Sequence, residues 1–222
     1  MAIILQIDTA SATAAVAISN NGQVLAAVEN QQMQEHASFL QPAVQKMLSE
    51  NGLTMQSLDA IAVVNGPGSY TGLRVGLASA KGLAYALDLP LISIGTLPLM
   101  AHAAFAKEQN TVILYAPMMD ARRMEVFTAV YDCEGNEKIS PVAMLLDNDS
   151  YAALLLQYRL LFFGSGAAKW KQVCMHENAL FANDYDTIQS LAQLSFKAFE
   201  TQQFAELAYT EPLYLKEFYT GQ

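Results

Sequence analysis

The most informative segment of the chain is Gly66-Pro67-Gly68-Ser69-Tyr70-Thr71-Gly72-Leu73-Arg74-Val75-Gly76, which follows an apolar run at residues 60–64. The apolar run predicts a buried strand, and the glycine-rich turn leads into a helix expected over residues 71–87, before Pro90. Ser69 or Thr71 is expected to cap this helix, whose first backbone N–H groups favour a neighbouring anion. The stretch lacks the Lys-Ser/Thr of a P-loop and does not fit G-x-G-x-x-G, so it supports generic phosphate binding only weakly.

The residues before this stretch predict the rest of an α/β unit. Apolar runs predict strands at residues 2–7, 13–18 and 23–28, and Asn20-Asn21-Gly22 is typical of a hairpin turn between the last two. Apolar side chains at three- and four-residue spacing predict a helix over residues 39–48, which Asn51-Gly52 ends.

The second half of the chain repeats this order of elements. Strands are expected at residues 111–116, 125–131, 139–145 and 160–163, and helices at 150–157, 167–174 and 187–201, with Gly164-Ser165-Gly166 as a second glycine turn. Each half therefore contains the order strand, strand, strand, helix, strand, helix, and the second half continues with the further helix at 187–201. This order predicts an α/β protein of two stacked lobes with a cleft between them, residues 1–104 and 105–222.

The composition excludes several classes of protein. The 222 residues are 53% hydrophobic and carry a net charge of −9, which excludes a disordered chain. At most two basic residues are adjacent, so the chain is not expected to hold nucleic acid unaided. Cys133 and Cys174 have no metal spacing and no signal peptide precedes them, which indicates a reducing, cytoplasmic setting. No apolar run reaches the ~18 residues of a membrane span, so no membrane association is expected.

Few side chains are candidates for chemistry. Asp8 and Thr9 follow the first strand and fit either a metal–phosphate group or a polar turn. Asp120 fits either a metal-linked acid or base or, as the favoured reading, a turn with an Asp–Arg pair. The histidines have no metal-ligand spacing, so we predict no metal site and no catalytic residue.

The helix at residues 71–87 carries a row of small residues. Gly72, Gly76, Ala80 and Ala84 stand four apart and form a smooth ridge that lets another element approach closely. The sequence leaves open whether that element is the chain's own sheet or another subunit. Arg74 lies among apolar residues and is expected to need a partner carboxylate, which another subunit would be able to supply.

These motifs together resemble the TsaB (YeaZ) family of bacterial accessory proteins for tRNA threonylcarbamoyladenosine biosynthesis. The resemblance covers essentially the whole chain and rests on Ile7-Asp8-Thr9-Ala10, the glycine-rich stretch, Asp120-Ala121-Arg122 with Glu125-Val126, and Pro212-Leu213-Tyr214-Leu215-Lys216. His36 followed by Leu40 and Pro42 is similar to the first helix of that family.

The resemblance implies a fold like that of actin, Hsp70 and the sugar kinases, with two ribonuclease-H-like lobes. It also implies a non-catalytic scaffold that activates TsaD, the subunit that transfers threonylcarbamoyl to tRNA, and that acts with the ATPase TsaE. The first-lobe helices, residues 36–50 and 71–87, would bind TsaD, or a second copy of the chain when TsaD is absent. The residues assigned to this interface are His36, Leu40, Val44, Gly72, Arg74, Gly76, Ala80 and Ala84. On this reading Arg74→Glu or Gly76→Leu weakens the complex without unfolding the chain, and tRNA is contacted only through the complex.

The resemblance further implies that the nucleotide turns are degenerate. Thr9-Ala10 and Ala121-Arg122 stand where active relatives have glycines, and Gly164-Ser165-Gly166-Ala167 resembles their adenosine turn. No cofactor is therefore expected on this chain alone, and a nucleotide at the interface with TsaD stays open. Two alternatives are a stand-alone nucleotide-dependent enzyme of the kinase type and, less favoured, a glycoprotease-type peptidase. Gly66, Pro67, Gly68, Ser69 and Thr71 are assigned a structural role.

Overall fold

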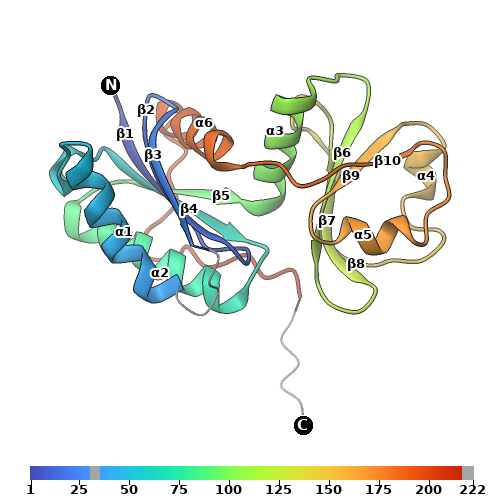
Figure 1. Ribbon diagram of the computed structural model, residues 1–222, viewed down its shortest axis with the longest axis horizontal. Helices are drawn as coiled ribbons and strands as arrows, with labels where there is room; N and C mark the ends of the chain where they lie inside the picture. Colours follow the sequence, from blue (N-terminus) through green and yellow to red (C-terminus); the bar gives the residue numbers. More distant parts are fainter. Residues whose placement is uncertain (31–35, 217–222) are drawn as a thin grey trace, which may run out of the picture. The chain divides into compact units, whose positions relative to one another are not determined.

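The computed structural model describes residues 1–30 and 36–216, with the side chain of residue 36 excepted. The chain divides into two compact units (Figure 1). Unit 1 comprises Met1–Thr96 and Thr187–Leu213, and unit 2 comprises Leu97–Asp186 and Tyr214–Gln222. Among the described residues, no helix is long and apolar enough to cross a membrane.

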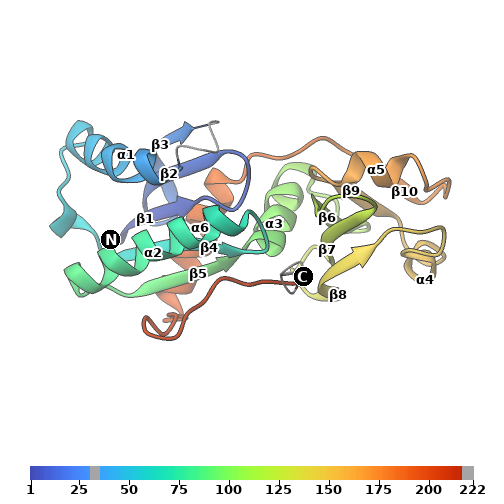
Figure 2. The same ribbon diagram turned by 90° about the horizontal axis from the view of Figure 1, so that it is seen from below.

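Unit 1 is built on a five-stranded mixed sheet in the order β3-β2-β1-β4-β5. Its central strand β1 pairs antiparallel with β2 and parallel with β4. The strands are β1 (Ile3–Asp8), β2 (Ala14–Asn20), β3 (Gln23–Asn30), β4 (Ala60–Gly66) and β5 (Leu91–Gly95). The helices α1 (His36–Glu50) and α2 (Tyr70–Leu87) lie on one face of this sheet, and α6 (Ile188–Glu200) lies on the other (Figures 1 and 2). A short 3₁₀ turn, Met55–Ser57, precedes β4.

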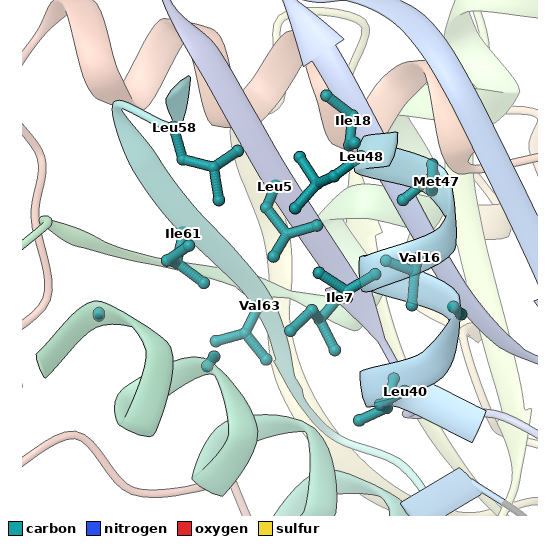
Figure 3. Close-up of a cluster of buried hydrophobic side chains, with 14 of the residues drawn as sticks. Leu5, Ile7, Val16, Ile18, Leu40, Met47, Leu48, Leu58, Ile61 and Val63 are labelled. Atoms are coloured by element: carbon teal, nitrogen blue, oxygen red, sulfur yellow. The ribbon is translucent and has the colours of Figure 1, made fainter. Parts of the chain in front are cut away.

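The central strands of unit 1 are apolar on both sides because helices cover both faces. Successive side chains of a strand point to opposite faces, so Leu5 and Ile7 of β1 pack against α1 and α2, as Figure 3 shows. Ile4 points the other way and packs with Ala198 of α6. Each fully buried Leu or Ile contributes about 1.5–3 kcal/mol. The continuous apolar runs in the sequence are therefore explained by a sheet buried on two faces.

Unit 2 has a second five-stranded mixed sheet, in the order β10-β9-β6-β7-β8. Tyr115 and Phe163 face α3, whereas Ala116 and Phe162 face the opposite layer, where Tyr151 and Trp170 pack. The strands are β6 (Leu114–Asp120), β7 (Glu125–Tyr131), β8 (Glu137–Leu145), β9 (Leu160–Phe163) and β10 (Ala179–Phe181), and the helices are α3 (Thr96–Glu108), α4 (Ala152–Leu155) and α5 (Ala167–Lys171).

The two sheets have the same topology, which confirms the predicted fold class. In each sheet the first strand of the unit is central, the second and third follow on one side, and the fourth and fifth on the other. The predicted elements all occur, in the predicted order along the chain. The structure adds four elements that the sequence does not predict, the 3₁₀ turn Met55–Ser57, β5, α3 and β10, and shortens the helices expected at 150–157 and 167–174 to α4 and α5.

The predicted boundary between residues 104 and 105 is corrected in two respects. The helix α3 belongs to unit 2, because Leu97, Ala101 and Ala104 pack into the core that contains Tyr115. The helix α6 returns to unit 1, where the Gln189 side-chain amide donates to the Gly22 carbonyl at 2.7 Å and accepts from the Val24 N–H at 3.3 Å. A boundary drawn by sequence order misses this return, because its contacts are far apart along the chain.

Candidate functional site

The turn after β1 is held against the first turn of α2. Asp8 accepts a hydrogen bond from the Ala10 N–H at 2.9 Å, which closes a local turn. Thr9 is fully buried, and its hydroxyl donates to the Gly72 carbonyl at 2.7 Å. Asp8 therefore forms a polar turn, and the Thr9 hydroxyl is bonded to the chain's own backbone.

The glycines of the sequence motif make this contact sterically feasible. A Cβ atom on Gly68 would overlap the Ala10 carbonyl oxygen, one on Gly72 would overlap the Thr9 carbonyl oxygen, and one on Gly76 would overlap the Thr9 hydroxyl. The N-terminus of α2 is also occupied from within the chain, because the Ser69 N–H donates to the Ala10 carbonyl at 2.7 Å. The glycines thus allow the turn at Thr9-Ala10 to pack directly against the first turns of α2.

Ser69 and Gly66, two further residues of the glycine-rich stretch, also have structural roles. Ser69, rather than Thr71, is the N-cap of α2, and its hydroxyl accepts from the Gly72 N–H at 3.3 Å. Gly66 has φ of +120° and precedes a cis peptide bond to Pro67. A Cβ atom on Gly66 would lie 2.7 Å from the Leu213 carbonyl oxygen, and the Leu213 N–H donates to the Asn65 carbonyl at 2.8 Å. The C-terminal motif therefore lies against the glycine-rich turn.

The small-residue ridge of α2 packs within unit 1. Ala80 and Ala84 are 0% and 1% exposed and share a core with Leu40 and Val44 of α1. The expectation that these four residues, with Gly72 and Gly76, face a partner is corrected, because all six are buried in their own unit. His36 lies in α1, but its side chain is outside the described residues.

The opposite face of α2 is the one that reaches solvent. Arg74 is exposed, and its guanidinium carbon lies 3.9 Å from the centre of the Tyr70 ring, so this cation stacks on an aromatic face and does not require a buried carboxylate. Tyr85 is 81% exposed, and a Cβ atom added to Gly82 would meet no atom of the described residues within 4 Å. We call the exposed residues Thr71, Arg74, Ala78, Gly82 and Tyr85 the outer face of α2.

In unit 2 the turn after β6 is closed by a lysine. The Lys169 ammonium lies 3.0 Å from the Asp120 carboxylate and donates to the Arg123 and Glu125 carbonyls at 2.7 and 3.1 Å. Burial raises the pKa of Asp120, but hydrogen bonds from the Arg122 N–H and from Lys169, with the Lys169 charge, bring it below its ordinary value. The expected Asp–Arg pair is corrected to an Asp–Lys pair, because Arg122 reaches Asp120 only through its backbone N–H.

The second glycine turn packs against the end of β6. Gly164 has φ of +97°, and a Cβ atom on it would overlap the Met118 carbonyl oxygen. The Gly166 N–H donates to that carbonyl at 2.9 Å, and the Ser165 hydroxyl accepts from the Asp120 N–H at 3.0 Å. The two turns of unit 2, at residues 120–125 and 164–166, therefore support each other.

A cavity of about 640 Å³ lies beside the second glycine turn. Phe181 gives it an aromatic wall, and Lys171 and Asp184 give it charged groups. Burial raises the pKa of Asp184 above its ordinary value. Nine residues line the cavity: Gly164, Ser165, Ala167, Ala168, Lys171, Phe181, Ala182, Asn183 and Asp184. Within the described part of the chain, no group of three or more His, Cys, Asp and Glu side chains is placed to hold a metal ion.

The close contact between α2 and Thr9 predicts a position-specific loss of stability. Gly72→Ala should lower the free energy of unfolding by about 1–3 kcal/mol, because its Cβ overlaps the Thr9 carbonyl. Gly82→Ala, on the outer face of the same helix, should instead raise it by up to about 1 kcal/mol, since Ala is the better helix former. Denaturant titration of both variants measures the difference, and equal effects would contradict the packing described.

The lowered pKa of Asp120 predicts a pH-dependent contribution to stability. A carboxyl whose pKa is lowered by folding stabilises the folded state above its unfolded pKa, and this contribution is lost as the pH falls through the folded value. Asp120→Asn should therefore destabilise unit 2 at pH 7, by under about 1 kcal/mol because the side chain is partly exposed. The difference from wild type should shrink below pH 3.8, the ordinary value. Asp149→Asn, in an exposed loop, is the control; a difference at Asp120 that does not depend on pH would refute this explanation.

Comparison with known proteins assigns the chain to a family. Residues 23–216 match the family model of TsaD, tRNA N6-adenosine threonylcarbamoyltransferase. The tRNA threonylcarbamoyladenosine biosynthesis protein TsaB of Escherichia coli is 41% identical over 133 residues, which are 60% of this chain and 56% of that protein. The TsaB protein of Bacillus subtilis is 32% identical over 173 residues, 77% of this chain and 74% of that protein. The matched part of the chain thus spans little more than half the length of the Escherichia coli relative.

Solved structures agree with this assignment. YeaZ from Pseudomonas aeruginosa superposes with a TM-score of 0.78 at 25% identity, over 97% of this chain and 100% of that chain. The (R)-2-hydroxyglutaryl-CoA dehydratase component A of Acidaminococcus fermentans, with a TM-score of 0.51 at 8% identity over 91% of this chain and 100% of that chain, shares the fold alone. By its match to the family model and to the Bacillus subtilis protein, the chain belongs to the TsaB (YeaZ) family, within the wider family described by the TsaD model.

Proposed function

We propose that this chain is a non-catalytic subunit in the biosynthesis of threonylcarbamoyladenosine on tRNA, where it binds and activates a TsaD-type transferase and acts with a TsaE-type ATPase. The observation that carries the proposal is the internal use of both polar turns. Thr9 and Ala10 fill the space beside the glycines of α2, and Asp120 is paired with Lys169. Groups that would otherwise be available to a phosphate or a metal are thus bonded to the protein itself.

The positions of the histidines also support a non-catalytic role. The resemblance attributes the metal site of TsaD to histidines, whereas His36, His102 and His176 lie in α1, in α3 and in the segment before β10. No two of these residues share an element, so the sequence offers no local metal-binding pair. The transfer chemistry is therefore assigned to the partner subunit.

The outer face of α2 is the surface that we assign to the partner. It combines an exposed tyrosine, Tyr85, with the small residues Ala78 and Gly82 and with the stacked pair of Arg74 and Tyr70. Aromatic and arginine side chains are enriched at the centres of protein interfaces, and small residues allow a partner helix to approach closely. The exposed side of α1, including Gln41 and Gln45, continues this surface, since α1 and α2 cover the same face of the sheet. A second copy of the chain would use the same surface when the transferase is absent.

The net charge and the internally bonded turns indicate where tRNA and a nucleotide would bind. With a net charge of −9, the chain repels a polyanion at long range, so tRNA is held mainly by the assembled complex in the cytoplasm. Because its polar turns are occupied from within, any nucleotide is expected at the interface with the transferase and not on this chain alone.

Substitutions on the two faces of α2 test the assigned surface. Gly82→Leu and Arg74→Glu should each weaken binding to the TsaD-type subunit of the same organism at least about tenfold without lowering the melting temperature of the isolated chain. Gly76→Leu, offered from the sequence as an equivalent test, should instead destabilise the fold, because its side chain overlaps Thr9. Leu145→Ser, an exposed position on β8, is the control. Wild-type affinity in both outer-face variants, measured by calorimetry, would show that the surface is wrongly assigned.

The alternative of a stand-alone nucleotide-dependent enzyme is favoured by one observation, the cavity of about 640 Å³ in unit 2. Calorimetry of the isolated chain with ATP and Mg²⁺ distinguishes the two functions. We expect no tight binding and no hydrolysis, because Thr9, Ala10 and Asp120 are already bonded within the protein. Micromolar binding accompanied by turnover would overturn the scaffold role in favour of a kinase-type enzyme.

A further inference from the structure

The turn between β6 and β7 presents two arginines to solvent in an unusual backbone conformation. Arg122 and Arg123 are exposed and have φ of +70° and +48°. Residues other than glycine adopt such conformations at a cost in free energy, so these conformations persist only where the surrounding structure enforces them. Apart from this pair, no two basic residues are adjacent in the sequence. The pair is therefore the most concentrated positive charge along an acidic chain.

Hydrogen bonds from the rest of unit 2 and within the turn fix the backbone conformation of this turn. Lys169, whose side chain is only 16% exposed, donates to the carbonyls of Arg123 and Glu125. The Arg122 N–H donates to Asp120 at 2.6 Å, and the Glu125 N–H donates to the Arg122 carbonyl at 3.0 Å. These hydrogen bonds fix the backbone from which the two arginine side chains extend, so little backbone entropy is lost when a ligand binds.

The carboxylates beside the turn are already paired. Asp120 is bound to Lys169, and Glu125 is bound to Lys216. Among the described residues, no carboxylate lies within the 4.0 Å of an ion pair from either Arg122 or Arg123. The positive charge of the turn is thus not cancelled by an ion pair among the described residues.

From this arrangement we infer that the Arg122–Arg123 turn contacts phosphates of the RNA backbone when the chain is assembled with its partner. The inference rests on the proposed function, which supplies tRNA as the substrate of the complex. Guanidinium groups bind phosphate oxygens in a bidentate manner, and the two adjacent arginines present two such groups to solvent. Two such contacts are too few to hold RNA on a chain of net charge −9, so the turn adds to a larger surface in the complex.

The test compares tRNA binding by two versions of the complex with the TsaD-type subunit. The probe is an unmodified transcript of a tRNA that decodes ANN codons. Arg122→Gln/Arg123→Gln should bind it about tenfold more weakly at low salt and should reduce the slope of log K against log salt by about two, because roughly one counterion is released per phosphate contact. Arg159→Gln/Lys107→Gln removes the same charge elsewhere in unit 2, from the residue before β9 and from the last turn of α3, and should leave the slope unchanged.

The outcomes separate this inference from the proposed function. If the wild-type chain forms no complex with the TsaD-type subunit, the proposed function fails and the inference fails with it. If the complex forms and binds tRNA, but the arginine variant matches the control variant in affinity and in slope, only this inference is overturned. Loss of complex assembly in the arginine variant would also overturn it, because the turn would then contact protein. Thermal unfolding of both variants confirms that the fold is retained.

Discussion

The contact between the turn after β1 and the first turns of α2 is the constraint on which unit 1 depends. Thr9 is buried, and its hydroxyl bonds to the carbonyl of Gly72, 63 residues away along the chain. Gly68, Gly72 and Gly76 are required there because a side chain on any of them would overlap Thr9 or Ala10. This approach sets the distance between α2 and the sheet, and it places the small residues of the helix inward and Arg74 and Tyr85 outward.

Unit 2 repeats the topology of unit 1, but the turn after its first strand, β6, is held by a charged lysine side chain. Lys169 joins Asp120 to two backbone carbonyls, and Ser165 accepts from the Asp120 N–H. In both units the end of the first strand is therefore bonded to the protein itself, by a buried threonine in one and by a lysine in the other. The proposed role of a partner-dependent subunit rests on this internal bonding.

Much of the fold was accessible from local sequence patterns, and the misassignments have identifiable physical causes. The central strands β1, β4 and β9 were predicted because strands buried on both faces appear as continuous apolar runs. The sequence shows the small-residue ridge of α2 but not which face of the helix is buried. Small residues occur on both faces, since Ala78 and Gly82 lie opposite the ridge, so only the position of the sheet identifies the buried face. The partner of Asp120 was misassigned because Arg122 is close in sequence, whereas Lys169 is brought near only by α5.

The order of elements, the glycine-dependent turns and the membership of a family can be read from the sequence, because periodicity and turn chemistry are local properties of neighbouring residues. The unit that contains α3 and α6, the buried face of α2 and the way in which Arg122 and Arg123 are held in solvent become visible in the folded structure. Each of these depends on contacts between segments distant along the chain, such as the bonds from Gln189 to the β2–β3 hairpin. Such contacts leave no periodic signal in a single sequence, because they depend on how helices pack against the sheet and not on which residues are neighbours along the chain.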